Sequence, residues 1–466
     1  MSNNTATRRM QRSMLMANEP IPRLILKMSV PTIVAFLINS IYSLADTYFV
    51  SGLGDSATAA VSVNASLDQL IMMCGSMLAV GANSYIARLL GEGQEKKASQ
   101  VLSTAFFLAF GLGLTLTVFG NIFMKPMVRL LGATADCEKY AVDYATYVLF
   151  AAPFMASNFV MNQCLRSEGS ATLSMVGMGA GGILNCILDP IFIFALDMGV
   201  AGASLATAIS KLVSFVILIF PYVTRRSMLH LSIRNFNFCK DIISKIVAVG
   251  SSSMFRSGLA VVAGILLNNL AGDIGGDPLL GGIGVSTKIM MFPFSIILGF
   301  GTGFQPVAGF NWGARRYDRV QQSYRFCSAV AIIGAIALSA VLAIFADPVI
   351  NLFGEGGGLM QEYGARCIRL QCFALPVHAW VAVVNMLCAG LGKGRNAFLL
   401  ATSRQGTCFI PVLYPLVYFF QANGIVAVQA VADVLSLALA VPIAIKVTRE
   451  IKAARERKEA EDRIST

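Results

Sequence analysis

The sequence is short of charge. Only 13% of its 466 residues are Asp, Glu, Lys or Arg, whereas 56% are hydrophobic. Soluble globular domains carry about 25% charged residues and about 45–50% apolar ones. A chain of this length could not cover a water-facing surface with so few charges. The composition therefore excludes a soluble globular protein and indicates one embedded in a membrane.

Residues that carry catalytic or metal chemistry are equally sparse. The two histidines cannot form a zinc cluster, and the ten cysteines are scattered singly with no CxxC pair, so we interpret them as small core residues. The glycine-rich stretches lack the spacing of a phosphate-binding loop. The apolar runs hold no acid–base pair, no nucleophile–histidine pair and no metal-ligand group. The sequence thus predicts neither an enzyme nor a bound cofactor.

Apolar windows of roughly 18–27 residues recur along nearly the whole chain, and each is long enough to cross a hydrocarbon core of about 30 Å as a helix. We therefore expect an all-α polytopic membrane protein. The N-terminus opens with polar and basic residues, so no signal peptide is expected. Hydropathy and turn signals predict twelve helices, at 28–50, 58–88, 98–124, 143–165, 171–196, 199–223, 243–271, 280–311, 322–346, 364–391, 397–420 and 424–446.

Positive charge gathers in the two tails and in alternate loops. The basic residues of these segments include Arg8, Arg9, Arg12, Lys96, Lys97, Arg225, Arg226, Arg315, Arg316, Lys393 and Arg395. By the positive-inside rule both termini are expected to be cytoplasmic, which requires an even number of helices. The net charge of +11 then reflects topology and contact with anionic lipid, and no nucleic-acid partner is expected.

The second half of the chain repeats the first. The phrase that begins at Gly81 lines up with the phrase that begins at Gly303, at an offset of 222. Further matches follow in order with a slowly drifting offset, including Pro153 with Pro376. Such a series indicates duplication. Six helices per half place both halves in the same orientation, which is the plan of a transporter with parallel repeats and a substrate cavity between them.

The expected architecture is therefore two six-helix lobes related by a parallel pseudo-two-fold repeat. The predicted segments are a cytoplasmic N-terminal tail at 1–27, an N-lobe at 28–223, a cytoplasmic linker at 224–242, a C-lobe at 243–446 and a cytoplasmic C-terminal tail at 447–466.

Two carboxylates lie inside predicted membrane helices. Asp189 follows Asn185 by four residues, so both side chains lie on one helical face, and Asp46 lies in the first helix. An ionisable residue at such a place is by default a candidate functional residue. Carboxylates in apolar surroundings can exchange a proton, or hold Na⁺ together with amide and hydroxyl oxygens. A structural alternative is that Asp189 caps or breaks a helix before Pro190 and that Asp46 meets backbone donors at a loop.

The repeat makes this site one-sided. Asp46 aligns with Asn268, and Asp189 falls among the uncharged residues 412–414, so we expect two buried carboxylates in the N-lobe at positions where the C-lobe has none. Other polar residues could line the cavity or could extend from a helix end to water. These are Asp68, Arg256, Asn268, Lys288 and Asp433.

The whole chain resembles the multidrug and toxic compound extrusion (MATE) family. The phrases that carry the likeness are PTIVAFLINSIYSLADTYFVSGLG, LRSEGSA, NCILDPIFIF, GVAGASLAT, SSSMFRSGL and GFGTGFQPVAGFNWGARRYDRV. The carboxylate in helix one, with no acidic residue in helices seven and ten, is similar to the DinF/MepA-like branch rather than the NorM branch.

The resemblance implies a cation-coupling site in the N-lobe and a proline at which helix one bends. The residues that match the family pattern are Asp46, Asn185, Asp189, Ala203 and Thr207, completed by Tyr144 and Asn162, with Pro31 as the hinge. If the ion is Na⁺, the residues expected to hold it are Asp46, Asn185, Asp189 and Thr207.

The function implied by the resemblance is secondary active antiport. Organic, often cationic, compounds would leave the cell in exchange for H⁺ or Na⁺ by alternating access. The expected setting is a bacterial cell (inner) membrane, with small molecules and the bilayer as partners and a monomer as the working unit. An alternative is a flippase for lipid-linked oligosaccharides or peptidoglycan precursors, which would need several basic cavity residues. Arg256 with Lys288 is a sparse version of that set.

Overall fold

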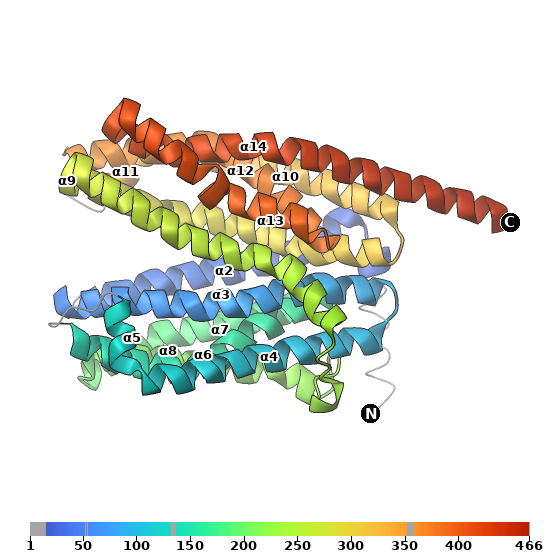
Figure 1. Ribbon diagram of the computed structural model, residues 1–466, viewed down its shortest axis with the longest axis horizontal. Helices are drawn as coiled ribbons and strands as arrows, with labels where there is room; N and C mark the ends of the chain where they lie inside the picture. The colour runs from blue at the N-terminus through green and yellow to red at the C-terminus, as the bar shows by residue number, and fades with distance from the viewer. Residues whose placement is uncertain (1–14, 52, 54, 132–136, 352–357, 466) are drawn as a thin grey trace.

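The computed structural model describes residues 15–51, 53, 55–131, 137–351 and 358–465. These residues are helical nearly throughout and include no strand (Figure 1). Residues 1–14 of the predicted N-terminal tail lie outside the described residues. The helices form two lobes that lie side by side, with α2 to α8 in one and α9 to α14 in the other (Figure 1).

Within the residues that the structure describes, the N-lobe contains six long helices and one short one. They are α2 (Ile21–Ser51), α3 (Asp55–Gly91), α4 (Glu95–Ile122), α5 (Met124–Leu130), α6 (Glu138–Ser167), α7 (Ala171–Pro190) and α8 (Gly199–Val223). A π-helical turn, η1 (Ile191–Ala195), extends α7.

The C-lobe follows a linker that holds a single 3-10 turn, η2 (Ile233–Asn235). Its helices are α9 (Lys240–Gly313), α10 (Tyr317–Ile344), α11 (Ala346–Asn351), α12 (Leu359–Gly390), α13 (Gly394–Thr402) and α14 (Phe409–Ser465). A second π-helical turn, η3 (Ser403–Thr407), joins α13 to α14.

Two C-lobe segments each contain two membrane crossings. Helix α9 is 74 residues long and turns back at Gly276, where φ is 59°, and α14 turns back at Gln421, where φ is 46°. Glycine adopts positive φ without strain, and Pro278 favours the break two residues later. Ten segments of the described chain are long and apolar enough to cross a membrane. Because two of them fold back, they make the twelve crossings that the sequence predicts.

The short helices α5 and α11 were not among the predicted elements. Each follows the third crossing of its lobe, and their first residues, Met124 and Ala346, are 222 residues apart. This is the same offset that the sequence repeat gives. The duplication therefore extends to the connections as well as the crossings.

The long helices extend beyond the predicted boundaries at both chain ends. Helix α2 begins at Ile21 rather than 28, and α14 continues to Ser465 rather than 446. The extension of α14 carries oppositely charged side chains four residues apart, such as Arg455 with Glu459 at 2.8 Å. Pairs at this spacing stabilise an exposed helix, so the charged tail stays helical after its apolar part has ended.

The two lobes meet closely where α3 crosses α9. A Cβ atom at Gly81 would lie 2.0 Å from the carbonyl oxygen of Ile246. One at Gly250 would lie 1.9 Å from the carbonyl oxygen of Met77. Small residues allow helix backbones to approach this closely. Both glycines lie near the helix ends that connect to the basic loops, so the two lobes are closed on that side.

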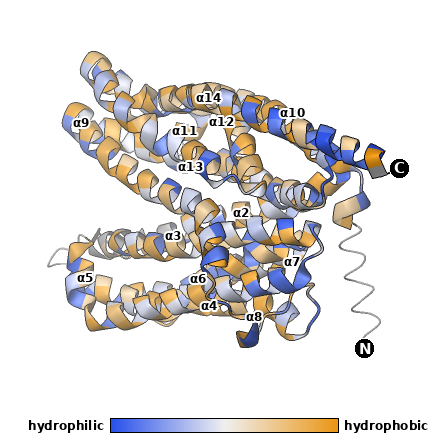
Figure 2. Cartoon of the chain, turned by 45° about the vertical axis from the view of Figure 1, so that its right-hand side comes forward, coloured by the Kyte–Doolittle hydropathy of each residue, from blue (hydrophilic) through white to orange (hydrophobic). Residues whose placement is uncertain are grey.

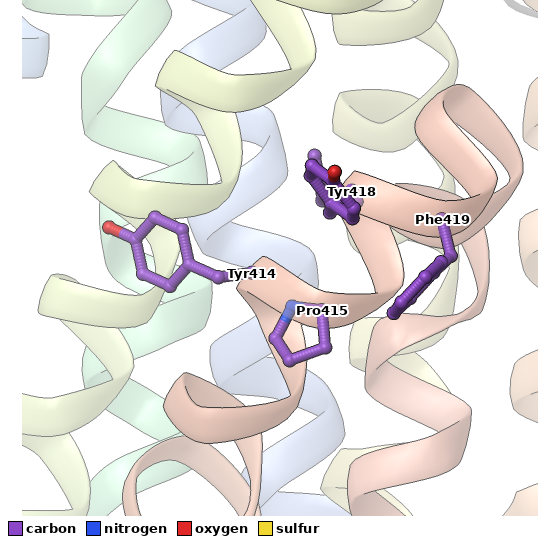
Figure 3. A pocket seen from close by; sticks show the side chains of 5 residues that line it. Tyr414, Pro415, Tyr418 and Phe419 are labelled. Carbon is purple, nitrogen blue, oxygen red and sulfur yellow. The ribbon is translucent and has the colours of Figure 1, made fainter.

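The surface of the molecule suits a bilayer. Hydrophobic residues run along the lengths of the helices, whereas the C-terminal end of α14 is rich in hydrophilic residues (Figure 2). Near its turn at Gln421, α14 carries Tyr414, Tyr418 and Phe419, which project from the ribbon around a shallow apolar hollow (Figure 3). Tyr418 and Phe419 are 81% and 73% exposed. Exposed aromatic rings at a helix end are typical of the membrane–water interface.

Candidate functional site

The one-turn motif of α7 forms a hydrogen-bonded network with α8. The Asn185 side-chain amide donates to Oδ1 of Asp189 at 3.2 Å and to Oγ1 of Thr207 at 3.2 Å. All three side chains are buried. Ala203 is fully buried one turn before Thr207 on α8. The network therefore brings together the helix-five and helix-six residues that the sequence selected.

Asp189 stands at the point where α7 changes its helical type. Pro190 has no backbone N–H to donate, and the π-helical turn Ile191–Ala195 follows directly. Single π-helical turns occur frequently at functional sites. The carboxylate accepts from the Asn185 side chain rather than serving as a backbone cap. Asp46 lies within α2 and not in a loop, whereas Asp189 does precede a change of helical type, as the structural alternative expects.

A cavity of about 440 Å³ opens beside this network, and we call it the N-lobe cavity. Its wall includes Asp46, Asp68, Tyr144, Asn162 and Thr207. The structure thus places four predicted coupling residues and one predicted cavity-lining residue around a single space. The Asn185 and Asp189 side chains lie behind Thr207 rather than in this wall.

Several oxygen atoms around this cavity are buried without a hydrogen-bond donor. Among the described residues, Oδ1 of Asp46, Oδ1 of Asp68, Oδ1 of Asn185 and Oδ2 of Asp189 have no partner. Buried polar atoms are nearly always satisfied in folded proteins. Carboxylate and carboxamide oxygens can accept a proton or ligate a hard cation such as Na⁺. This set of oxygen ligands therefore fits a cation that the chain itself does not supply.

Lys211 is a functional candidate that the sequence reasoning missed. It lies on α8 one turn after Thr207, lines the N-lobe cavity, and donates from Nζ to the Tyr42 hydroxyl at 3.0 Å. Its charge interacts with those of Asp68 and Asp46. Lys211 is the only charged residue of α8. The argument that selected Asp189, a lone charge in an apolar span, applies equally to this lysine.

Arg166 was quoted within a family phrase but given no role. It is 1% exposed and lines the N-lobe cavity, and its Nε donates to Ser174 Oγ at 2.9 Å. Its Nη1 and Nη2 have no hydrogen-bond partner in the described part of the chain. A second basic residue therefore lines the same cavity as the carboxylates of Asp46 and Asp68.

The remaining family positions of the N-lobe lie close by. Tyr144 is 3% exposed, and the side chain of Asn162 donates to the Ser174 carbonyl at 3.1 Å, which fixes α6 to α7. Pro31 lies inside α2, which is a single helix from Ile21 to Ser51. Its role as a hinge stays a prediction.

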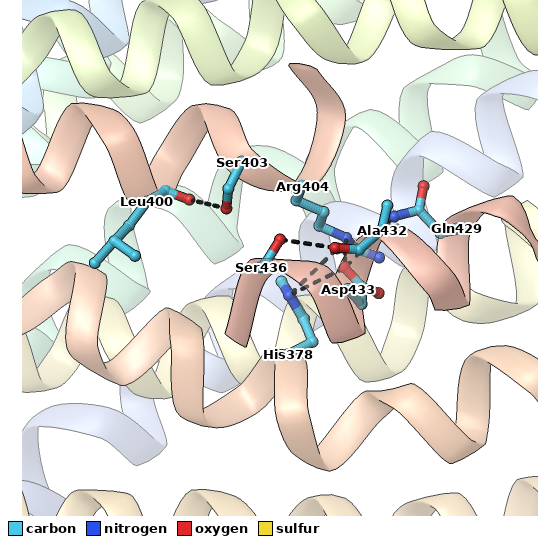
Figure 4. Close-up of polar contacts among 8 residues, drawn as sticks. All are labelled: His378, Leu400, Ser403, Arg404, Gln429, Ala432, Asp433 and Ser436. Atoms are coloured by element: carbon cyan, nitrogen blue, oxygen red, sulfur yellow. Dashed lines mark hydrogen bonds and ion pairs between the residues drawn. The ribbon is translucent and has the colours of Figure 1, made fainter. Parts of the chain in front are cut away.

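The C-lobe also contains a buried carboxylate, at a position that matches neither carboxylate of the N-lobe in the repeat. Asp433 on α14 is 1% exposed and pairs with Arg404, with Nε 2.9 Å from Oδ1 (Figure 4). His378 contributes Nδ1 at 3.8 Å from the same oxygen. The repeat could not reveal this pair, because Asp433 matches neither Asp46 nor Asp189 in position. Asp433 is covered by Arg404 and does not itself line the cavities described here.

The other predicted cavity residues of the C-lobe divide into two groups. Arg256 and Lys288 each line a C-lobe cavity. Asn268 is exposed on α9 and is absent from the walls of the N-lobe and C-lobe cavities. A role for Asn268 in lining a cavity stays a prediction.

No group of three or more His, Cys, Asp or Glu side chains within the described residues could hold a metal ion. The N-lobe oxygens come partly from Asn and Thr, which such a group would not include.

Comparison with known proteins gives one consistent family. The family model MatE matches residues 31–191 and again 253–414. The two matches begin 222 residues apart, which confirms the internal duplication. Multidrug export protein MepA of Staphylococcus saprophyticus is 29% identical over 424 residues, covering 89% of this chain and 91% of that protein. MepA of Staphylococcus aureus is 27% identical over 423 residues, covering 91% and 93%.

Solved structures agree with the sequence matches. A crystal structure of MATE in complex with MaL6 superposes with a TM-score of 0.89 at 25% identity, covering 95% of this chain and 99% of that one. An outward-facing multidrug resistance MATE transporter of the MOP superfamily gives a TM-score of 0.88 at 26% identity, with 95% and 98% covered. The chain therefore belongs to the MatE family, as a MepA-like multi-pass membrane transporter and not an enzyme.

Proposed function

We propose that this chain exports small organic compounds, often cations, from a bacterial cell in exchange for H⁺ or Na⁺. The observation that carries the proposal is the N-lobe cavity, where unpartnered oxygens of Asp46 and Asp68 lie beside the Asn185–Asp189–Thr207 network. The MepA relatives are named as multidrug export proteins, which supports the same direction of transport here.

Charge counting explains how one site couples two fluxes. When ionised, Asp46, Asp68 and Asp189 bring three negative charges to this part of the N-lobe, and Lys211 offsets only one of them. An excess of negative charge remains. H⁺, Na⁺ or an organic cation would reduce that excess. Substrate and coupling ion would then exclude each other, and each would bind only when the other has left.

The arrangement of the two lobes supports exchange of substrate and coupling ion on the outer side of the membrane. The lobes are closed where α3 crosses α9 at Gly81 and Gly250, near the basic loops. Both ends of the described chain lie on that side: Arg319 donates to the Glu19 carbonyl at 2.7 Å, and Lys458 donates to the Arg315 carbonyl at 3.2 Å. With the basic loops in the cytoplasm, the cavity opens outward, where an ion would enter and substrate would leave.

The later steps follow the same logic. Ion binding neutralises Asp46, releases a cationic substrate outward, and lets α2 bend at Pro31. The lobes then rock to open the cytoplasmic side. A monomer suffices, because both lobes and the cavity belong to one chain. No nucleic acid takes part, because the basic residues flank membrane helices.

Transport by purified protein in proteoliposomes tests the proposal. The ethidium flux is measured while Na⁺ and pH gradients are imposed separately, without nucleotide. We expect one of the two gradients to drive the flux, and that gradient names the ion. Flux that requires ATP, or that ignores both gradients, would contradict antiport.

A further inference from the structure

The C-lobe holds a second polar region that the coupling scheme does not use. Two cavities of about 320 and 380 Å³ share Phe294 and Arg404 in their walls. Arg256 lines the first and Lys288 lines the second. Within the described residues no Asp or Glu side chain lines either one. We call the two together the C-lobe cavity.

Arg404 is held firmly in this wall. It lies in the π-helical turn Ser403–Thr407, its Nε pairs with Asp433, and its Nη1 lies 3.2 Å from Nε2 of His378 (Figure 4). Its guanidinium carbon lies 3.9 Å from the centroid of the Phe294 ring. Because Asp433 balances its charge, Arg404 and Phe294 form a neutral, flat, pre-organised surface for stacking.

Arg256 has no such counter-charge. Its side chain donates a hydrogen bond to Ser253 at 3.4 Å, and no described carboxylate forms an ion pair with it. Arg404, which lines the same cavity, carries a charge of the same sign. Arg256 is half-buried in the cavity wall, and a partly buried charge without a counter-charge is unfavourable. The structure therefore presents a guanidinium that an anion from outside the chain would neutralise.

We infer that the C-lobe cavity binds the carboxylate of an aromatic substrate, with the carboxylate on Arg256 and the ring on Phe294 and Arg404. A guanidinium fork matches a planar carboxylate with two parallel hydrogen bonds. Gln69 and Met72 of α3 line this cavity and the N-lobe cavity alike. A zwitterion therefore fits best, with its cationic end toward Asp46 and Asp68. The inference rests on the proposed export of organic compounds, to which it adds the C-lobe residue that would recognise the anionic end of a substrate.

Equilibrium binding of a matched dye pair tests the inference. The first dye is a rhodamine with a free benzoate carboxylate, and the second is its methyl ester, which keeps the ring and the cation but lacks the anion. The two are titrated into the full-length protein in phosphatidylcholine nanodiscs, with no ion gradient. We expect Arg256→Gln to weaken the acid by about tenfold and to leave the ester within about twofold, as loss of one charge-assisted hydrogen-bond pair predicts.

Two further variants serve as controls. Arg256→Lys keeps the charge without the fork and should recover part of the lost affinity. Arg325→Gln removes an exposed arginine of α10 outside these cavities and should change neither dye. Arg256→Gln should also keep the thermal stability of the parent, because its side chain makes a single long hydrogen bond.

Three results would overturn the inference. Equal weakening of both dyes by Arg256→Gln would mean that the arginine shapes the cavity without recognising an anion. No weakening of either would remove Arg256 from the site. Displacement of the acid by added phosphatidylglycerol would assign the cavity to a lipid phosphate. These binding measurements use no ion gradient, so they would be unchanged if the proposed ion coupling failed. If the parent protein bound neither dye, that result would count against the proposed export itself.

Discussion

The ammonium group of Lys211 lies 3.0 Å from the hydroxyl of Tyr42 and 4.8 Å from the centre of its ring. The contact joins α8 to α2, the helix that carries Asp46. It holds a positive charge in the same cavity wall as the carboxylates of Asp46 and Asp68. The N-lobe cavity therefore holds a cluster of basic as well as acidic side chains.

Replacing Lys211 should unbalance this cluster in a predictable direction. In Lys211→Met the carboxylates lose a positive neighbour, so cationic ethidium should bind about tenfold more tightly and leave more slowly. Fluorescence polarisation on the purified protein measures the affinity. Tyr42→Phe, which keeps the charge and removes only the hydroxyl, is the matched control and should stay close to the parent. Unchanged or weaker binding in Lys211→Met would show that the lysine does not offset Asp46 and Asp68.

Asp46→Asn should abolish export of ethidium while leaving expression intact. The amide is nearly the same size as the carboxylate, but it cannot take up or release a proton and carries no charge for Na⁺. Dye efflux from cells, with membrane levels checked by immunoblot, makes the measurement. Asp273→Asn alters an exposed carboxylate of α9 and should transport normally. Unimpaired efflux in Asp46→Asn would remove Asp46 from the coupling mechanism.

The hydrogen bonds of the Asn185–Asp189–Thr207 network should be needed for transport. Asn185→Leu removes the donor to both Asp189 and Thr207, which leaves buried acceptors unpaired at a cost of about 1–3 kcal/mol. We expect gradient-driven flux to fall by more than about tenfold. Thr207→Ser keeps the hydroxyl and should retain most of the flux, whereas Thr207→Val should not. Proteoliposome flux compares the three variants, and equal activity of Thr207→Ser and Thr207→Val would argue against a role for the hydroxyl.

The closed side of the molecule should be sensitive to a single methyl group. In Gly81→Ala the new Cβ would meet the Ile246 carbonyl at 2.0 Å, so α3 and α9 must separate. Overpacking of this kind typically costs about 1–3 kcal/mol. Thermal unfolding in detergent should show the loss. Gly111→Ala places a methyl group where nothing lies within 4 Å and should be neutral. If both variants unfold at the parent temperature, the lobes do not pack as described.

Much of the cation site could be predicted because its geometry is local. Asn185 and Asp189 are one turn apart, so helical periodicity alone places them on one face. The same reasoning could have selected Lys211 as the lone charge of α8. It could not have paired that lysine with Tyr42, because the two residues are 169 positions apart and meet only when α8 packs near α2.

The membrane class, the twelve crossings, the duplication and the placement of charge within individual helices could all be predicted from the amino-acid order. They follow from hydropathy, periodicity and repetition, which act over one helix or one repeat. Which charges meet depends instead on how the helices pack together. Asp433 meets Arg404 and Arg256 stays without a counter-charge, because ion pairing depends on distances between helices. Those distances are set by how closely each pair of helix surfaces packs.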